Sequence, residues 1–211
     1  MVKIFYRNLL KFFLRLYDFA YQKINSVAIR YYGMHPKHKF NDFHKFFIDR
    51  IPNDARVLDI GCSRGELTVD LATKASYVAA YDISEEAIKS AIKNRSRQNI
   101  NYFVGEATNN MPQEQFDIAV CSNVLEHLED SDVFLKKLNA IAKKVLIRVP
   151  NFDNNWILGV KKDLKMEYFL DPQHRREYVV DSIKKELNNT GWIIESMEAS
   201  TEIRIMAGRK S

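Results

Sequence analysis

VLDIGCSRGELTVDLA, residues Val57–Ala72, is the stretch that decides the fold. An apolar run leads into Asp59, a turn with Gly61 and Gly65 follows, and apolar residues at helical spacing come after the turn. This order predicts a strand, a tight loop and a helix. Together they form the first unit of a nucleotide-type α/β fold.

A second acid lies one strand further along the chain. The next apolar run ends at Asp82, where a carboxylate can accept hydrogen bonds from the hydroxyls of a ribose. Asp59 and Glu66 flank the glycine-bearing loop, and their charges disfavour a pyrophosphate, which binds to backbone amides at a helix N-terminus. The same charges suit a cofactor that carries an ammonium and a sulfonium group.

The rest of the chain alternates between strand and helix patterns. Five β-α units followed by two final strands predict an open, mostly parallel sheet. Residues 151–176, a polar and aromatic insertion after the fifth strand, are expected to be irregular. The expected strands are 56–60, 77–82, 100–104, 116–121, 144–149, 192–197 and 202–208.

These motifs resemble those of the class I SAM-dependent methyltransferases, whose first motif reads roughly D/E-x-G-x-G-x-G. The resemblance covers about residues 34–208 and departs from the motif at Ser63. It implies an α/β, Rossmann-like fold with a mostly parallel seven-stranded sheet, an antiparallel last strand and, here, an N-terminal helical extension. It also implies S-adenosyl-L-methionine (SAM) as the cofactor. The segment 35–38, H-P-K-H, is similar to one in small bacterial methyltransferases associated with surface polysaccharide biosynthesis.

The resemblance assigns cofactor contacts to residues at successive strand ends, which meet at one edge of such a sheet. The first loop approaches the methionine portion, Asp82 binds the ribose, and Glu106 accepts the adenine amino group. A cation of the 35–38 segment is expected to bind the methionine carboxylate, and a polar loop without a ligand is the alternative. The full expected set is Asp59, Gly61, Cys62, Ser63, Gly65, Asp82, Ile83, Glu106, Ala107, Cys121, Asn123, His35 and Lys37.

Methyl transfer to a hydroxyl requires a base within hydrogen-bond reach, and histidine suits this role near neutral pH. The sequence favours His174 as a metal-free base, with His127 and Glu126 beside the cofactor. The pattern Glu126-His127 with a later histidine also resembles metal-assisted ubiquinone-type and small-RNA 2′-O-methyltransferases. Because Asn123 stands in the place of their first glutamate, we expect no metal, and a divalent ion is the alternative.

The acceptor is the least defined part of the prediction. Aromatic residues and the pair Arg175-Arg176 in the insertion favour a sugar, phosphosugar or other glycan precursor, because arginine forks bind phosphate and carboxylate. One alternative is a quinone- or lipid-precursor O-methyltransferase at a membrane surface. Another is a non-catalytic SAM-binding subunit of a partner enzyme.

The charge distribution and the cysteine content bear on the substrate class, the cellular location and the domain organisation. Residues 1–50 hold ten Lys and Arg against three Asp, whereas the remainder is slightly acidic, which disfavours a nucleic-acid substrate. The two cysteines form no disulfide framework and fit a cytoplasmic location. We therefore expect a basic helical cap or lid over residues 1–50. A SAM-binding domain over 51–211, with an acceptor-side insertion at 151–180, follows it.

The cap itself allows two interpretations. Lys3, Arg7, Lys11 and Arg15 recur every fourth residue between apolar and aromatic residues, which predicts an amphipathic helix. The helix can pack over the domain or against a second copy in a homodimer. It can instead lie on a membrane surface, at the inner face of the membrane, through residues 1–30. The spacing of its charges excludes a transmembrane span.

Overall fold

The computed structural model describes residues 2–33, 36, 43–106, 112–169, 171 and 173–210. The chain forms two compact units, one of Met1–Phe43 with Asn155–Phe169 and the other of His44–Asn154 with Leu170–Ser211. All predicted strands lie in the second unit. The first division between these units falls at 43/44, and the functional division at 50/51 stays a prediction. Part of the predicted acceptor-side insertion groups with the N-terminal segment.

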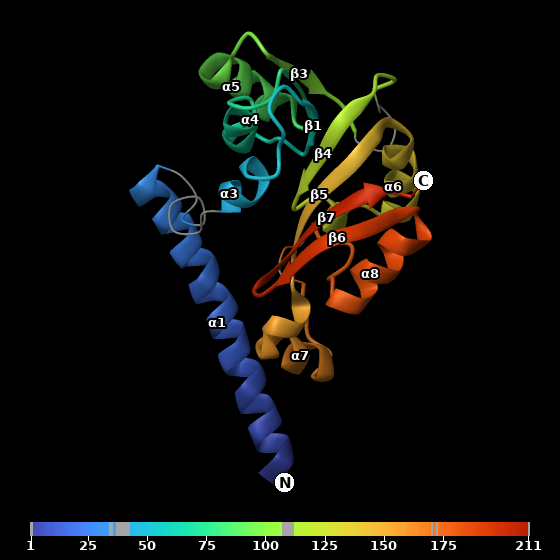
Figure 1. Cartoon of the computed structure of the whole chain (residues 1–211). Coiled ribbons are helices and arrows are strands. Elements are labelled where there is room, and N and C mark those ends of the chain that lie inside the picture. Colours follow the sequence, from blue (N-terminus) through green and yellow to red (C-terminus); the bar gives the residue numbers. More distant parts are fainter. Residues whose placement is uncertain are drawn as a thin grey trace. The chain divides into compact units, whose positions relative to one another are not determined.

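The second unit is built on one seven-stranded sheet of order β3-β2-β1-β4-β5-β7-β6 (Figure 1). Strands β1 to β5 are parallel to one another, and the last strand, β7, is antiparallel to both β5 and β6, as predicted. The strands are β1 Arg56–Ile60, β2 Tyr77–Asp82, β3 Ile100–Val104, β4 Phe116–Ser122, β5 Ala142–Pro150, β6 Trp192–Ala199 and β7 Glu202–Arg209.

Helices lie along this sheet and connect its parallel strands (Figure 1). Ser84 caps α5 by accepting a hydrogen bond from the amide of Ala87, the role that its short polar side chain predicts. The helical elements of this unit are α4 Glu66–Leu71, α5 Glu85–Arg95, η1 Leu125–His127, α6 Ser131–Ile141, η2 Phe152–Asn154 and α8 Val180–Asn189. The short helix α3, Phe43–Ile48, begins at the boundary between the units.

The burial of the strands follows from their sequences. The central strands β1, β4 and β5 consist mostly of consecutive buried residues, as expected for parallel strands that are covered on both faces. Strand β7 alternates between buried and less buried residues over most of its length, which is the pattern of an antiparallel strand with one covered face. The core of the unit therefore lies along β1, β4, β5 and β7. The site residues lie at the edge of the sheet where β1, β4 and β5 end and the antiparallel β7 begins.

The first unit contains α1, Val2–Tyr32, and α7, Trp156–Asp163. Lys161 of α7 donates to Asp18 of α1 at 2.5 Å, so the two helices are paired. The expectation of an irregular 151–176 segment was wrong over α7, where Asn155 caps a helix by accepting from the amide of Ile157. Among the described residues, no helix combines the length and the apolar composition needed to cross a bilayer.

Candidate active site

A cleft of about 760 Å³ lies at the carboxyl ends of the central strands. Residues from the loop after β1, the ends of β2 and β3, the segment after β4 and the segment before α8 line it. The predicted site residues that line it are Gly61, Ser63, Asp82, Ile83, Glu106, Asn123 and His127. The structure therefore gathers residues that are far apart in the sequence into one site.

The loop after β1 has a backbone that demands glycine at two positions. Gly61 has φ 71°, and an added Cβ would lie 2.6 Å from Cγ2 of Val124. Gly65 has φ 82°, and an added Cβ would lie 2.5 Å from the hydroxyl of Tyr102. Both glycines are therefore required by conformation and by space. Ser63 also lies in the left-handed region, with φ 50°, which explains why glycine is the residue expected there.

Asp82 holds the loop as well as lining the cleft. One carboxylate oxygen accepts from the amide of Ser63 at 2.8 Å, and the other accepts from the amide of Ser84 at 2.8 Å. Each oxygen keeps a further lone pair for an acceptor role toward a ligand hydroxyl. The carboxylate is thus fixed by two backbone donors, one from each of the segments that follow β1 and β2.

Asp59 lies beneath the cleft instead of lining it. Its side chain is 2 % exposed, and Oδ2 accepts from the hydroxyl of Thr68 at 2.7 Å. Burial raises the pKa of this carboxyl to about 7, against the lowering effect of the Thr68 hydrogen bond. Cys62 and Cys121 are likewise buried, and burial raises the pKa of both thiols, so they are inert neutral groups.

The adenine-side residues are only partly described. Ile83 is 73 % exposed and lines the cleft beside Glu106, where an apolar side chain and a carboxylate suit a purine ring and its amino group. Tyr81, stacked on Phe103 with ring centroids 4.7 Å apart, lines the same part of the cleft. The predicted contacts of Ala107, His35 and Lys37 fall outside the described residues.

Asn123 follows β4 and is held by a buried arginine. Its φ is 57°, a left-handed conformation that asparagine tolerates better than most residues. Its side-chain oxygen accepts from Nε of Arg148 at 3.1 Å, and Arg148, 5 % exposed, also faces Glu202 at 3.7 Å. A cationic side chain therefore engages the amide at the position where the metal-assisted enzymes carry a glutamate.

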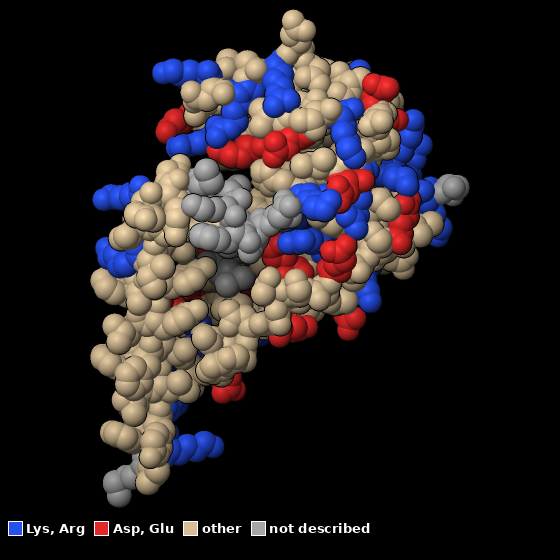
Figure 2. Space-filling model, turned by 60° about the vertical axis from the view of Figure 1, so that its left-hand side comes forward, with Lys and Arg blue, Asp and Glu red and all other residues tan. Residues whose placement is uncertain are grey.

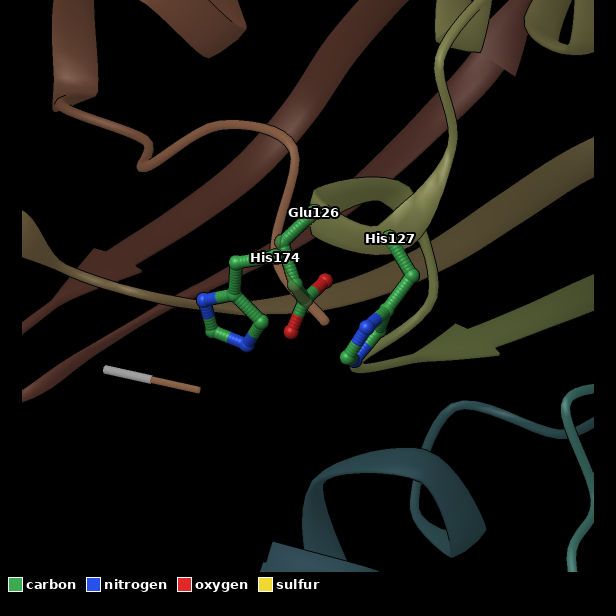
Figure 3. Close-up of side chains that lie close together, drawn as sticks. All are labelled: Glu126, His127 and His174. Atoms are coloured by element: carbon green, nitrogen blue, oxygen red, sulfur yellow. The ribbon is translucent and has the colours of Figure 1, made fainter. Parts of the chain in front are cut away.

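Glu126, His127 and His174 form one cluster. Figure 3 shows the carboxylate of Glu126 between the two imidazole rings. The ring centroids of His127 and His174 are 4.8 Å apart, and their planes are nearly perpendicular. The backbone fixes this arrangement, because the carbonyl of Glu126 accepts from the amide of Arg175 at 2.8 Å. The segment before α8 is thereby tied to the η1 turn after β4.

The two histidines differ in environment. His127 lines the cleft, whereas His174, the residue favoured as base from the sequence, is 7 % exposed and pairs through Nδ1 with Glu177 at 2.8 Å. Burial, and next the charge of His174, lower the pKa of His127. Burial also acts to lower the pKa of His174, but the hydrogen bond and charge of Glu177, with Glu126, outweigh it and the pKa is raised. The direction of the shift therefore favours the neutral imidazole at His127 and the protonated form at His174.

Glu126 is fully buried, and neither carboxylate oxygen has a hydrogen-bond partner among the described residues. Burial raises its pKa to about 7. Donor atoms of Glu126, His127 and His174 lie within 4.8 Å of one another. Ligands on opposite sides of an ion at about 2.1 Å are about 4.2 Å apart, so the cluster has the composition of a metal site but must contract slightly to hold an ion.

Sequence reasoning missed several residues of this site. Glu177, which orients His174, and Thr68, which donates to Asp59, belong to helical or insertion segments whose contacts depend on the tertiary fold. Arg148 sits inside a strand and carries no motif. Of the predicted arginine pair, only Arg175 lines the cleft, because Arg176 lies 3.7 Å from Glu186 on α8.

Comparison with known proteins agrees with this geometry. A family model described as a methyltransferase domain matches residues 32–196. The ubiquinone biosynthesis O-methyltransferase of Rickettsia bellii (strain OSU 85-389) is 23 % identical over 188 residues, which are 83 % of this chain and 73 % of that protein.

Solved structures share the fold. The magnesium protoporphyrin IX methyltransferase of Synechocystis PCC 6803, solved with bound S-adenosylhomocysteine (SAH), has a TM-score of 0.63 at 19 % identity over 82 % of this chain and 83 % of that one. A SAM-dependent methyltransferase from Mesorhizobium loti has a TM-score of 0.63 at 18 % identity over 77 % and 94 %. With its sheet order, its strand-end acids and a family match over most of its length, this chain belongs to the class I SAM-dependent methyltransferases.

Proposed function

We propose that this enzyme is an O-methyltransferase whose acceptor is a phenolic hydroxyl of a quinone precursor, and that His127 takes the proton of that hydroxyl. The observation that carries the proposal is the position of His127, a half-buried histidine in the wall of the cofactor cleft and in contact with a second histidine. The acceptor class is supported by the distant relative, which is named for O-methylation in ubiquinone biosynthesis.

The reaction requires an in-line displacement at the cofactor's methyl group. The acceptor oxygen forms a bond to the methyl carbon, the bond from that carbon to sulfur breaks, and the sulfonium becomes the neutral thioether of SAH. The hydroxyl proton passes to the free ring nitrogen of His127. A phenol suits this base, because its proton is far more acidic than that of a sugar hydroxyl.

The surrounding residues support a base at His127. The lowered pKa keeps its imidazole neutral near pH 7. Arg175 and Gln173, which also line the cleft, add polar groups on the acceptor side. The cleft volume of about 760 Å³ falls in the range of sites that enclose a cofactor-sized ligand with a small partner.

The test is a SAH-release assay with a catechol, 3,4-dihydroxybenzoate, and with a sugar nucleotide as the competing acceptor class. We expect turnover with the catechol and a fall of about 10²–10⁴-fold in kcat for His127→Gln. The affinity for SAM should stay within about threefold of wild type. His44→Gln is the matched control, because His44 pairs with Asp70 away from the cleft.

Three results would count against the proposal. Turnover with the sugar nucleotide alone would return the acceptor to the glycan class. A kcat for His127→Gln equal to that of the control would show that His127 is not the base. Loss of turnover on chelation, restored by Mg²⁺, would favour a second candidate, metal-assisted transfer, for which the grouping of Glu126, His127 and His174 is the specific observation.

A further inference from the structure

Helix α1 carries a large apolar face that the described residues leave exposed. Phe5, Phe12, Leu16 and Phe19 are 51–63 % exposed, although each is a large apolar side chain. Their spacing of seven, four and three residues places them on one side of the helix. Further exposed apolar residues of the first twenty positions are Val2, Ile4, Tyr6, Leu9, Leu10, Phe13 and Tyr17.

The opposite side of α1 is marked by different contacts. Asp18, one turn after the buried Leu14, pairs with Lys161 of α7 at 2.5 Å. At 100° per residue, Leu14 lies about 160° from Phe12 and Leu16, and Asp18 lies about 120° from Phe12 and about 160° from Leu16. The helix therefore has one side that faces α7 and another that carries aromatic side chains. Figure 2 shows that most of the surface over α1 is uncharged.

The charges of α1 are almost all positive. Lys3, Arg7, Lys11, Arg15, Lys23 and Arg30 stand against a single acid, Asp18, which is already paired with α7. Within the described part of the chain, none of these cations forms an ion pair. Arg15 lies at the border of the apolar face, from which a long side chain extends past an apolar surface, whereas Lys3 and Arg7 lie on the opposite side of the helix. Lys23 and Arg30 lie on the apolar side itself, so the apolar face is continuous only over about the first twenty residues.

We infer that α1 binds the surface of a bilayer that contains anionic phospholipid, with its apolar face among the acyl chains and its cations at the headgroups. Monomers rarely expose contiguous apolar patches of several hundred Å² without a binding role. A helix of this composition, with a charged side and aromatic residues on the other, is typical of segments that lie in the membrane interface. The inference rests on α1 alone and is independent of the acceptor proposed above.

Charge selects the lipid surface over a second copy of this chain. Pairing two α1 helices through their apolar faces would bring two strongly cationic segments side by side, which is unfavourable. A leaflet of anionic lipid has the complementary charge and attracts each nearby Lys or Arg. The apolar face also contains three phenylalanines, Phe5, Phe12 and Phe19, and large aromatic side chains gain most from leaving water.

The experiment is sedimentation of the full-length protein with phosphatidylglycerol-containing vesicles and with pure phosphatidylcholine vesicles, at about 0.05 M and about 0.5 M salt. We expect binding to the anionic vesicles at low salt and a marked loss of binding at high salt. Phe5→Gln with Phe12→Gln should weaken the partition at least about tenfold. Lys3→Gln with Arg7→Gln should weaken it about fivefold per charge at low salt.

The control carries an equal change elsewhere. Ile92→Gln with Val133→Gln replaces two exposed apolar residues on α5 and α6, 50 % and 41 % exposed, and should bind vesicles like wild type. SAM titration of every variant shows that the second unit is folded. Absence of wild-type binding to anionic vesicles at low salt would overturn the inference. So would retained binding by the phenylalanine variant, equal binding to neutral vesicles at high salt, or a concentration-dependent dimer lost in that variant.

Discussion

The two halves of the cleft are built by different means. On the cofactor side, backbone groups hold the key side chain, since the amides of Ser63 and Ser84 fix both oxygens of Asp82 at 2.8 Å. On the acceptor side, side chains from segments more than forty residues apart hold one another, as His127 and His174 do at 4.8 Å between centroids. The cofactor side is a rigid, local construction, and the acceptor side is a long-range one.

The two halves also differ in the burial and hydrogen bonding of their carboxyl groups. The carboxylate of Asp82 lines an open cleft and accepts hydrogen bonds from two backbone amides. Glu126 is buried without a hydrogen-bond partner among the described residues, and its pKa is raised to about 7. One half therefore contains a carboxylate that backbone donors fix, whereas the other contains a buried carboxyl and two histidines whose pKa values are shifted.

The largest expected difference between the two halves of the cleft is in the pH dependence of kcat, which should depend on the acceptor side. Because the pKa of His127 is lowered, kcat should stay constant down to a pH below the ordinary histidine value and then fall about tenfold per unit. His174→Gln removes the neighbouring positive charge, so the pKa of His127 should rise and the fall should begin at higher pH. Stopped assays from pH 5 to 8 measure this dependence. If kcat falls at the same pH in wild type and in His174→Gln, the two histidines are not electrostatically coupled.

A smaller effect is expected at the first loop. Gly61→Ala places a Cβ 2.6 Å from Val124 in a left-handed backbone. It should lower the free energy of unfolding by about 2–3 kcal/mol, as measured by urea denaturation. Adding Val124→Ala removes the clashing methyl group and should restore about half of the lost free energy of unfolding. The other half remains, because alanine is unfavourable in the left-handed backbone conformation of residue 61. A double variant no more stable than the single one would show that the clash is not the cause.

At the acceptor side, stability should depend on pH through His174. Its folded pKa is raised above the unfolded value, so the pairing with Glu177 stabilises fully below about pH 6.5 and is lost as pH rises through the folded value. Glu177→Gln should therefore cost on the order of 1 kcal/mol at pH 5.5 and much less at pH 9. Urea midpoints at the two pH values test this, and a cost that grows with pH would contradict the assignment.

The smallest effect concerns Ser63, the departure from the glycine pattern. Its φ of 50° is unfavourable for serine and acceptable for glycine. Ser63→Gly should raise the free energy of unfolding by about 0.5 kcal/mol and leave the affinity for SAM nearly unchanged. Thermal melts resolve a change of this size, and destabilisation would mean that the serine side chain makes a contact that outweighs the strain.

The same contrast explains what the sequence could predict. The first loop and Asp82 are recognisable because local backbone geometry requires glycines and an acid at fixed spacing, and the positions of the strands along the chain follow from the apolar runs. The sequence could not show that His127 lines the cleft and that His174 is buried, because their exposure depends on how the segment before α8 folds over η1. Helix α7 was missed because it lies within a polar and aromatic segment that carries little helical pattern. Its capping residue is Asn155, and its pairing with α1 depends on the tertiary fold.

The most direct test of this account is a calorimetric titration of SAM into the wild type, Asp82→Ala and His127→Gln. We expect Asp82→Ala to weaken binding about 10²-fold, through the loss of charge-assisted hydrogen bonds and of the support of the loop. His127→Gln should bind like wild type, because it belongs to the other half. Equal affinities for all three proteins, or a loss in His127→Gln as large as that in Asp82→Ala, would contradict the division of the cleft into a cofactor half and a proton-transfer half.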